Sequence, residues 1–170
     1  MNKLLTIWNA LSRRQLFLLG AATVAVLFGS ALYLQYVLRQ DPCPLCMVQR
    51  VIFIVIGVLF FVAALHNAQQ AGAKVYSILI ALTALGGVAV AARHIWIQHL
   101  PADQVPACGP GLEYMLQNFP LAEVWQELMH GSGECAAKGW TFLALGIPEW
   151  SLVWYVLLGV FAVMVGWKKN

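Results

Sequence analysis

Apolar residues in this chain gather in four long blocks separated by shorter, more polar segments. The blocks run over Leu16–Leu34, Met47–Leu65, Val75–Ala92 and Ser151–Trp167. A membrane-spanning helix needs roughly 20 predominantly apolar residues, and the blocks approach this length. Backbone groups in lipid must be hydrogen-bonded within their own segment, so each block is expected to be a helix. The pattern predicts an all-α membrane protein, a bundle of four transmembrane helices forming one domain over residues 1–170.

Composition supports lipid as the solvent for these helices. Hydrophobic residues make up 61% of the 170 residues and charged residues 10%, whereas a soluble domain usually has about 25% charged residues. The first block follows Lys3, Arg13 and Arg14, as a secretory signal would. No small-residue cleavage site follows it, so it is expected to be a retained helix.

Charges are distributed unevenly around the four blocks. The N-terminal segment, the turn after the second block and the C-terminal segment together hold six basic and no acidic residues: Lys3, Arg13, Arg14, Lys74, Lys168 and Lys169. All seven acidic residues lie in the other connections or beside them. Because basic residues stay cytoplasmic, both termini are expected in the cytoplasm. This topology accounts for the net charge of +3 without a nucleic-acid partner.

The four cysteines form two pairs that are expected to share the outer face of the membrane. Cys43-Pro44-Leu45-Cys46 joins the first two blocks, and Cys108 and Cys135 lie in the long connection between the last two. Disulfides persist outside the cytosol and are rare within it. Two pairs on one side of a bilayer point to electron transfer through thiols.

The first pair coincides with the predicted start of a helix. Pro44 suits the first turn, where its missing N–H costs nothing, so Cys43 is expected near the N-cap and Cys46 within the first turn. The free N–H groups and the helix dipole favour an anion there, and they lower the pKa of a thiol. Because the thiolate is the nucleophile in disulfide exchange, this position favours a reactive cysteine.

Three polar residues are candidates for binding an electron acceptor near this pair. Arg50 lies four residues after Cys46 and shares its helix face, so it can stabilise a thiolate or a developing oxyanion, or else snorkel to the interface. Gln49 can donate a hydrogen bond or face a neighbouring helix. His94 is expected at the outward end of the third helix, either as a ligand or as a solvated residue at a helix C-terminus.

The long connection contains turns and one amphipathic helix. Apolar residues recur at helical spacing over Leu121–Met129, so this helix is expected either in the membrane interface or packed on the bundle. The segment Gly131-Ser132-Gly133 is expected to end it and to leave Cys135 movable. A disulfide between Cys108 and Cys135 is then either exposed and labile or a static staple.

Other cysteine chemistry fits the spacing poorly. Structural zinc sites favour two short pairs, which the spacing between Cys108 and Cys135 does not provide, so no metal is expected. A c-type haem needs C-x-x-C-H, but Met47 follows Cys46.

Taken together, these residues resemble the DsbB family of bacterial inner-membrane proteins. The resemblance extends over nearly the whole chain: four spans, Cys-Pro-Leu-Cys, Gln49-Arg50, Arg93-His94, the two loop cysteines and the segment from Trp140 to Trp150. Position 49 is often acidic in the family and is glutamine here.

The resemblance implies a function and a set of roles. DsbB proteins reoxidise DsbA, a periplasmic dithiol oxidase, and pass its electrons to ubiquinone or menaquinone in the inner membrane of Gram-negative bacteria. Cys108 would be attacked by DsbA and Cys135 would be its disulfide partner, whereas Cys43 and Cys46 would form the membrane-proximal pair. Cys46 would contact the quinone, and Arg50, His94 and Gln49 would lie around its ring.

Two other interpretations are considered. A vitamin K epoxide reductase-like protein also couples membrane thiols to a quinone, but its reactive pair belongs to a late helix. A non-enzymatic membrane protein with two structural disulfides does not explain Cys-Pro-Leu-Cys at a helix start with Arg50 beside it.

Overall fold

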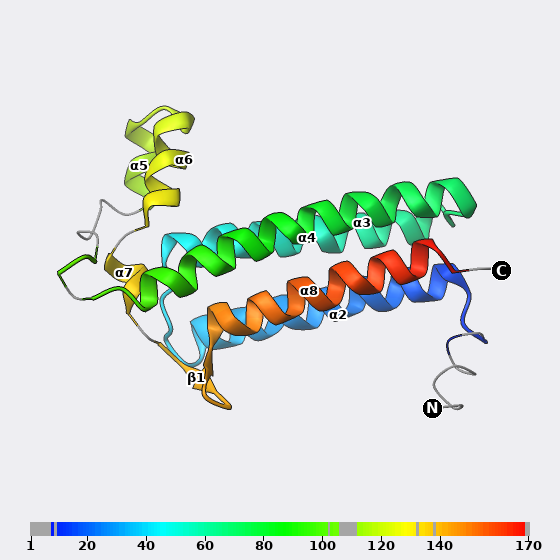
Figure 1. Ribbon diagram of the computed structural model, residues 1–170, viewed down its shortest axis with the longest axis horizontal. Coiled ribbons are helices and arrows are strands. Elements are labelled where there is room, and N and C mark those ends of the chain that lie inside the picture. The colour runs from blue at the N-terminus through cyan, green and yellow to red at the C-terminus, as the bar shows by residue number, and fades with distance from the viewer. Residues whose placement is uncertain are drawn as a thin grey trace.

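The computed structural model describes residues 8, 10–101, 103–105, 112–131, 133–137 and 139–168. Its long helices run alongside one another as a bundle (Figure 1): α2 (Arg13–Tyr36), α3 (Pro44–Leu65), α4 (Gln70–Gln98) and α8 (Ile147–Gly166). All four are long and apolar enough to cross a membrane. The predicted all-helical architecture with four membrane helices is confirmed.

Local sequence signals set where two of these helices begin. Ser12 and Gln15 form a capping box at the start of α2, in which each side chain accepts a hydrogen bond from the other residue's backbone N–H. Cys43 is the N-cap of α3, and Pro44 follows it in the first turn. The predicted placement of Cys43 at a helix start is therefore confirmed.

Helix α4 is longer than the apolar block that predicted it. Arg93 and His94 were expected to end this helix, but it continues to Gln98. The expectation was wrong because the polar side chains find partners without leaving the helix. His94 is buried and hydrogen-bonded, and Arg93 lies over the Trp96 ring at 5.1 Å from its centroid.

The helices pack against one another mainly in chain order. α2 packs along α3, α3 along α4 and α4 along α8, whereas α8 contacts α2 less extensively. Their facing side chains form a continuous core, in which the largest fully buried residues include Leu16, Phe17, Ile56, Phe60, Ile80 and Tyr155. Van der Waals packing of this kind holds membrane helices together, because lipid tails are as apolar as the side chains.

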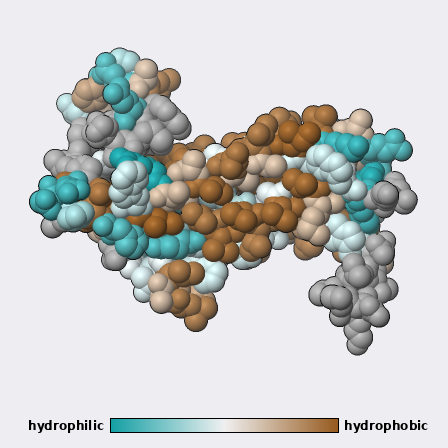
Figure 2. Space-filling view, in the orientation of Figure 1, coloured by the Kyte–Doolittle hydropathy of each residue, from teal (hydrophilic) through white to brown (hydrophobic). Residues whose placement is uncertain are grey.

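The outside of the bundle is also apolar. Side chains such as Val26, Val58, Leu82 and Leu85 are more than half exposed. In Figure 2 hydrophobic residues cover the middle of the visible face, and hydrophilic residues gather toward both ends. This distribution suits a bundle whose middle faces lipid and whose ends face water.

Tyr155 reaches closely into the α4–α8 interface at Gly87. A Cβ atom placed on Gly87 would lie 2.6 Å from two atoms of the Tyr155 ring, closer than real side chains approach. The neighbouring Gly86 has no heavy atom within 4 Å of the same position. Glycine at position 87 is therefore required by close helix packing.

This difference predicts opposite effects of alanine at two adjacent glycines. Gly87→Ala is expected to lower the unfolding free energy by about 1–3 kcal/mol, because it overpacks the interface. Gly86→Ala is the matched control and should be neutral or slightly stabilising, since glycine inside a helix costs about 0.5–1 kcal/mol relative to alanine. Thermal unfolding in detergent measures both, and equal midpoints would contradict the packing argument.

Basic residues tie one end of the bundle together. Arg13 donates hydrogen bonds to the Lys168 carbonyl and, at 3.3 Å, to Gln69 Oε1. Lys168 Nζ donates to the Trp8 carbonyl at 2.8 Å. These contacts join the start of α2, the α3–α4 turn and the end of α8, which lie at the same end of the bundle in Figure 1.

The remaining elements gather at the opposite end. They are α5 (Leu112–Asn118), α6 (Leu121–His130), α7 (Gly133–Ala136), β1 (Thr141–Phe142) and β2 (Leu145–Gly146). The predicted amphipathic helix is confirmed as α6, whose Val124 packs with Met115 and Val48 while Leu121 is exposed. The antiparallel β1–β2 hairpin was not predicted, because its strands are too short to show a period.

Candidate functional site

The Cys43–Cys46 pair lies at the first turn of α3. The two Sγ atoms are 3.0 Å apart, and the Cys46 backbone N–H donates a hydrogen bond to Cys43 Sγ at 3.4 Å. Cys43 is buried, whereas Cys46 is partly exposed. The helix start thus brings the two sulfurs together, so that a small movement joins them in a disulfide with a bond of about 2.05 Å.

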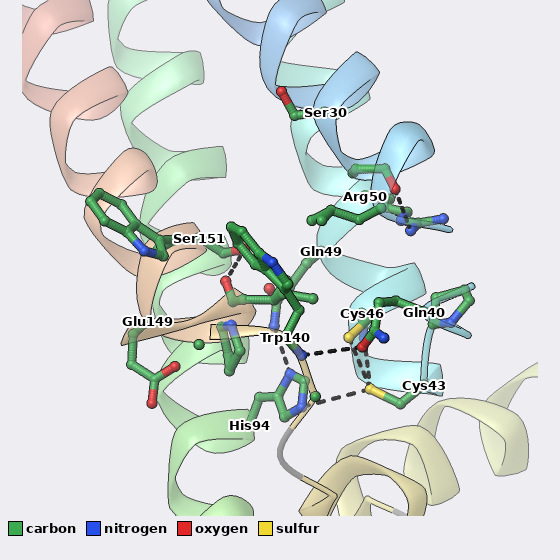
Figure 3. A pocket seen from close by; sticks show the side chains of 18 of the residues that line it. Ser30, Gln40, Cys43, Cys46, Gln49, Arg50, His94, Trp140, Glu149 and Ser151 are labelled. Carbon is green, nitrogen blue, oxygen red and sulfur yellow. Dashed lines mark hydrogen bonds between the residues drawn. The ribbon is translucent and has the colours of Figure 1, made fainter. Parts of the chain in front are cut away.

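His94 and Gln49 extend this pair into a chain of polar contacts (Figure 3). His94 Nε2 lies 3.6 Å from Cys43 Sγ, and its Nδ1 lies 3.2 Å from Gln49 Nε2. Both side chains are buried, with 2% and 3% of their surface exposed. These contacts therefore link the sulfur pair at the start of α3 to α4. His94 is a buried partner of Cys43 and not a solvated residue at a helix end.

Cys135 joins the same cluster from the long connection. Cys135 has no exposed surface and packs with Cys43, Leu45 and Ile97. The expectation of an exposed Cys135 was wrong, whereas its expected freedom to move stays a prediction. Gly131 does turn the chain, with a φ of 82°, but α7 then docks on α3 and α4. Cys108 lies outside the described residues.

The environment of Cys43 keeps its thiol protonated. A hydrogen bond with Cys135 lowers the pKa of Cys43, but the hydrogen bond with Cys46, burial and the neighbouring Cys46 charge outweigh it. Together they raise the pKa of Cys43 from 9.0 to about 12. Of the two sulfurs in the pair, Cys43 is therefore a weak nucleophile near neutral pH.

This shift predicts slow alkylation of Cys43 in the reduced protein. At pH 8 about one Cys43 in 10⁴ is ionised when its pKa is 12, compared with about one in ten at a pKa of 9. Iodoacetamide labelling followed by peptide mass spectrometry should therefore show Cys43 reacting about 10³-fold more slowly in folded than in denatured protein. Stability should fall between pH 9 and 12, because only the unfolded chain loses this proton there. A labelling midpoint near pH 9 in the folded protein would contradict the shift.

Arg50 lies beside the pair but is anchored to α2. Its guanidinium donates one hydrogen bond to Gln35 Oε1 and another, at 3.3 Å, to the Ala31 carbonyl. It lines the same cavity as Cys46. Arg50 therefore does not simply extend to the interface, and a partner that sequence reasoning missed, Gln35, holds its charge in place. The only sequence signal for this partner is that Gln35 directly follows the apolar block that ends at Leu34.

A cavity of about 1050 Å³ opens next to these residues. Its polar lining includes Cys46, Gln49, Arg50 and His94, and its apolar lining includes Leu27, Phe28, Leu34 and Phe53. A few polar groups in a mostly apolar cleft are typical of a site that orients one small ligand. A quinone with an apolar tail fits this lining. The hydrogen-bond donors can bind the ring oxygens, and the apolar side chains of α2 can contact the tail where the cavity approaches the lipid-facing surface.

Two residues that the sequence did not single out for the site, Tyr155 and Trp140, also support it. The Tyr155 hydroxyl donates to the Gln49 carbonyl at 2.7 Å, and its ring stacks on Phe53 at 4.3 Å between centroids. The Trp140 backbone N–H donates to Gln40 Oε1 at 3.1 Å. These contacts attach α8 and the hairpin segment to the cavity, and such long-range pairings have no local sequence signal.

Comparisons with known proteins agree with this geometry. A family model described as disulfide bond formation protein DsbB matches residues 13–165. Disulfide bond formation protein B of Hahella chejuensis is 53% identical over 146 residues, which cover 86% of this chain and 88% of the relative. The protein of the same name from Nitrosococcus oceani is 50% identical, with 90% of each chain covered.

A third relative, from Chromobacterium violaceum and also called disulfide bond formation protein B, is 49% identical. The match covers 94% of this chain and 97% of that relative. The family match thus extends over the helices that build the cavity and its sulfur pair. The chain therefore belongs to the DsbB family of disulfide bond formation proteins, whose activity is thiol:quinone oxidoreduction.

Proposed function

We propose that this chain reoxidises a DsbA-like periplasmic thiol oxidase and passes the electrons through its two cysteine pairs to a membrane quinone. The observation that carries the proposal is the packing of Cys135 against Cys43 at the edge of the cavity. A cysteine from the long connection thereby meets the membrane-proximal pair. Exchange between the pairs needs only local movement, because attack requires a thiolate beside a disulfide sulfur.

Electrons enter the chain by thiol–disulfide exchange at the loop cysteines. A DsbA thiolate attacks Cys108 of the Cys108–Cys135 disulfide, which forms a mixed disulfide and releases Cys135. The second DsbA thiol then attacks the DsbA sulfur of the mixed disulfide and releases Cys108. DsbA leaves oxidised, and the loop pair holds the two electrons as thiols.

The two electrons then move to the membrane-proximal pair. Cys135 attacks the Cys43–Cys46 disulfide at Cys43, the sulfur against which it packs, and Cys46 leaves as the thiolate. Cys108 resolves the new bond, which restores the loop disulfide and leaves Cys43 as a thiol. Each exchange breaks one S–S bond and forms one, so electrons and sulfur bonds balance.

Discharge to the acceptor takes place at Cys46. A bound quinone supplies the sink for two electrons and two protons as the Cys43–Cys46 disulfide forms again. Cys46 is the sulfur that reacts with the acceptor, because it is the more exposed of the two cysteines at the cavity and Cys43 keeps its proton. Arg50 stabilises negative charge on the acceptor oxygen, and Gln49 and His94 orient the ring. His94 Nε2 lies 3.6 Å from Cys43 Sγ and can receive the Cys43 proton once rotation of the Gln49 amide presents its Oε1 to a protonated His94 Nδ1.

The site is proposed to face the periplasm from the inner membrane of a Gram-negative bacterium. Four of the seven described basic residues, Arg13, Arg14, Lys74 and Lys168, lie at the α2 start, the α4 start and just beyond the α8 end, where no described acidic residue lies, and basic residues stay cytoplasmic. Cys43, Cys46 and Cys135 lie at the other end, which is proposed to be the side where disulfides persist. Ubiquinone and menaquinone both meet the requirements of the site.

A direct assay tests the proposal. Purified protein is mixed with reduced DsbA and a soluble ubiquinone or menaquinone analogue, and quinone absorbance is followed. We expect a loss of quinone that depends on DsbA thiols. No thiol-dependent loss with either analogue would refute the function.

The loop step has its own variant. Cys108→Ser is expected to lose oxidation of DsbA, while its Cys43–Cys46 pair still reduces the quinone analogue when supplied with a small dithiol. Full activity toward DsbA in Cys108→Ser would contradict the role assigned to the loop.

A further inference from the structure

Three ligating atoms meet at the start of α3 in a way that thiol exchange alone does not require. Cys43 Sγ, Cys46 Sγ and a ring nitrogen of His94 all lie within 4.8 Å of one another. They come from two helices that pack together, and Figure 3 shows the three side chains converging. Thiolate and imidazole are the ligands that zinc and similar cations prefer.

Two of the three distances between ligating atoms are close to those of a tetrahedral site. With Zn–S of about 2.3 Å and Zn–N of about 2.0 Å, a tetrahedron places two sulfurs about 3.8 Å apart and a sulfur about 3.5 Å from the nitrogen. Cys43 Sγ and His94 Nε2 are 3.6 Å apart. The two sulfurs are 3.0 Å apart, so they must separate by less than 1 Å. Cys46 can supply this movement because it is only partly buried.

Burial and charge also favour a divalent cation. Cys43 is 8% exposed and Cys46 is partly buried, so a thiolate at Cys43 would be poorly solvated and would lie beside a second thiolate at Cys46. One divalent cation neutralises both of them, which removes much of the cost of buried charge. Gln49 lies beside His94 Nδ1, the ring nitrogen that does not face Cys43. Rotation of the Gln49 amide presents its Oε1 to a protonated His94 Nδ1, which leaves His94 Nε2 free to bind the metal.

We propose that the reduced Cys43–Cys46 pair and His94 form a binding site for a soft transition-metal cation such as Zn²⁺. Binding releases the two thiol protons to water, and each thiolate sulfur donates a lone pair to the cation. The disulfide form offers no thiolate and does not bind the cation. The cation thereby holds the protein in the reduced state and blocks its activity; this inhibitory consequence rests on the proposed function, whereas the binding does not.

Cobalt binding tests the site without quinone or DsbA. The reduced, quinone-free protein in detergent is titrated anaerobically with Co²⁺, which reports tetrahedral thiolate coordination through visible d–d bands and near-ultraviolet charge-transfer bands. We expect one Co²⁺ per chain, displaced by one Zn²⁺. Protein whose four cysteines have been oxidised should show neither band. A reduced protein without these bands, or bands that persist after oxidation, would overturn the proposal.

Matched variants identify the ligands. Cys43→Ser and Cys46→Ser should each abolish the charge-transfer bands, and His94→Gln should weaken Zn²⁺ binding by more than about 100-fold, since even indirect ligand partners contribute 10–100-fold. His99→Gln is the control: His99 also lies at the cavity on the α4 side, but its Nδ1 bonds the Ile95 carbonyl at 2.8 Å. His99→Gln should bind Zn²⁺ with the affinity of the unmodified protein. An equal loss of Zn²⁺ affinity in His94→Gln and His99→Gln would overturn the assignment of His94 as a ligand. Circular dichroism confirms folding.

Inhibition is measured separately. One equivalent of Zn²⁺ added to the reduced protein should slow quinone reduction at least about tenfold, and a chelator should restore the rate. Persistent activity in zinc-bound protein would overturn the inhibitory role. If cobalt binds and no thiol-dependent quinone loss occurs at all, the proposed function fails and the metal site stands.

Discussion

Cys46→Ser is expected to abolish quinone reduction, lowering the rate by about 10³-fold or more, as removal of an enzyme nucleophile does. Cys46 lies in the first turn of α3 and lines the cavity, whereas Cys43 keeps its proton. Serine preserves the size of the side chain, but its hydroxyl is a poor nucleophile and cannot form a disulfide. Quinone absorbance after addition of reduced DsbA measures the effect.

A second measurement separates this chemical loss from misfolding. Cys46→Ser retains Cys108, so it should still form the mixed disulfide with DsbA, which non-reducing electrophoresis detects. A thermal midpoint close to that of the unmodified protein would confirm the fold. A variant that keeps its mixed disulfide and also reduces quinone at the original rate would remove Cys46 from the proposed role.

Arg50→Met is expected to have the second largest effect, a loss of about 10–100-fold in kcat/KM for quinone. Hydrogen bonds to charged groups contribute about 1.5–3 kcal/mol, and methionine keeps the length of the side chain without its charge. Arg50 lines the cavity beside Cys46, and the Gln35 and Ala31 contacts hold its guanidinium there. Steady-state kinetics with varied quinone concentration measure the loss.

Arg93→Met is the matched control for that substitution. Arg93 lies near the C-terminal end of α4, at the same end of the bundle as the sulfur pair, but it contacts the Trp96 ring and is not among the described residues that line the cavity. Its kcat/KM for quinone should change less than about twofold, as surface substitutions away from a site usually have small effects. Equal losses in the two variants would show a general effect of membrane-surface charge.

Much of the fold was predictable because lipid imposes a strong local rule. Each apolar block had to form a helix, and the blocks that begin at Leu16, Met47, Val75 and Ser151 all lie within helices of the structure or extend to their ends. The start of α3 was predictable for a local reason as well, since Pro44 favours a first turn. Helix lengths were less predictable, because polar partners let α4 continue past the apolar residues.

The candidate site was predictable in its residue types and unpredictable in its contacts. Cys43, Cys46, Arg50, Gln49 and His94 all lie at one cavity. The position of Gln35 directly after an apolar block hinted at a partner, but only the packing of α2 on α3 shows that Arg50 donates to it. Cys135 was expected to be exposed, because the glycines before it suggested a flexible segment, but it is buried.

What the sequence by itself determined is therefore the set of membrane helices and the position of the sulfur pair at a helix start. Both follow from interactions between residues close together in the chain, namely backbone hydrogen bonding in lipid and the first-turn preference of proline. Tertiary structure alone decided that His94 meets Cys43, that Tyr155 fills the space beside Gly87, and that α7 delivers Cys135 to the pair. These contacts join residues far apart in sequence, and they depend on how side chains of different helices fit together.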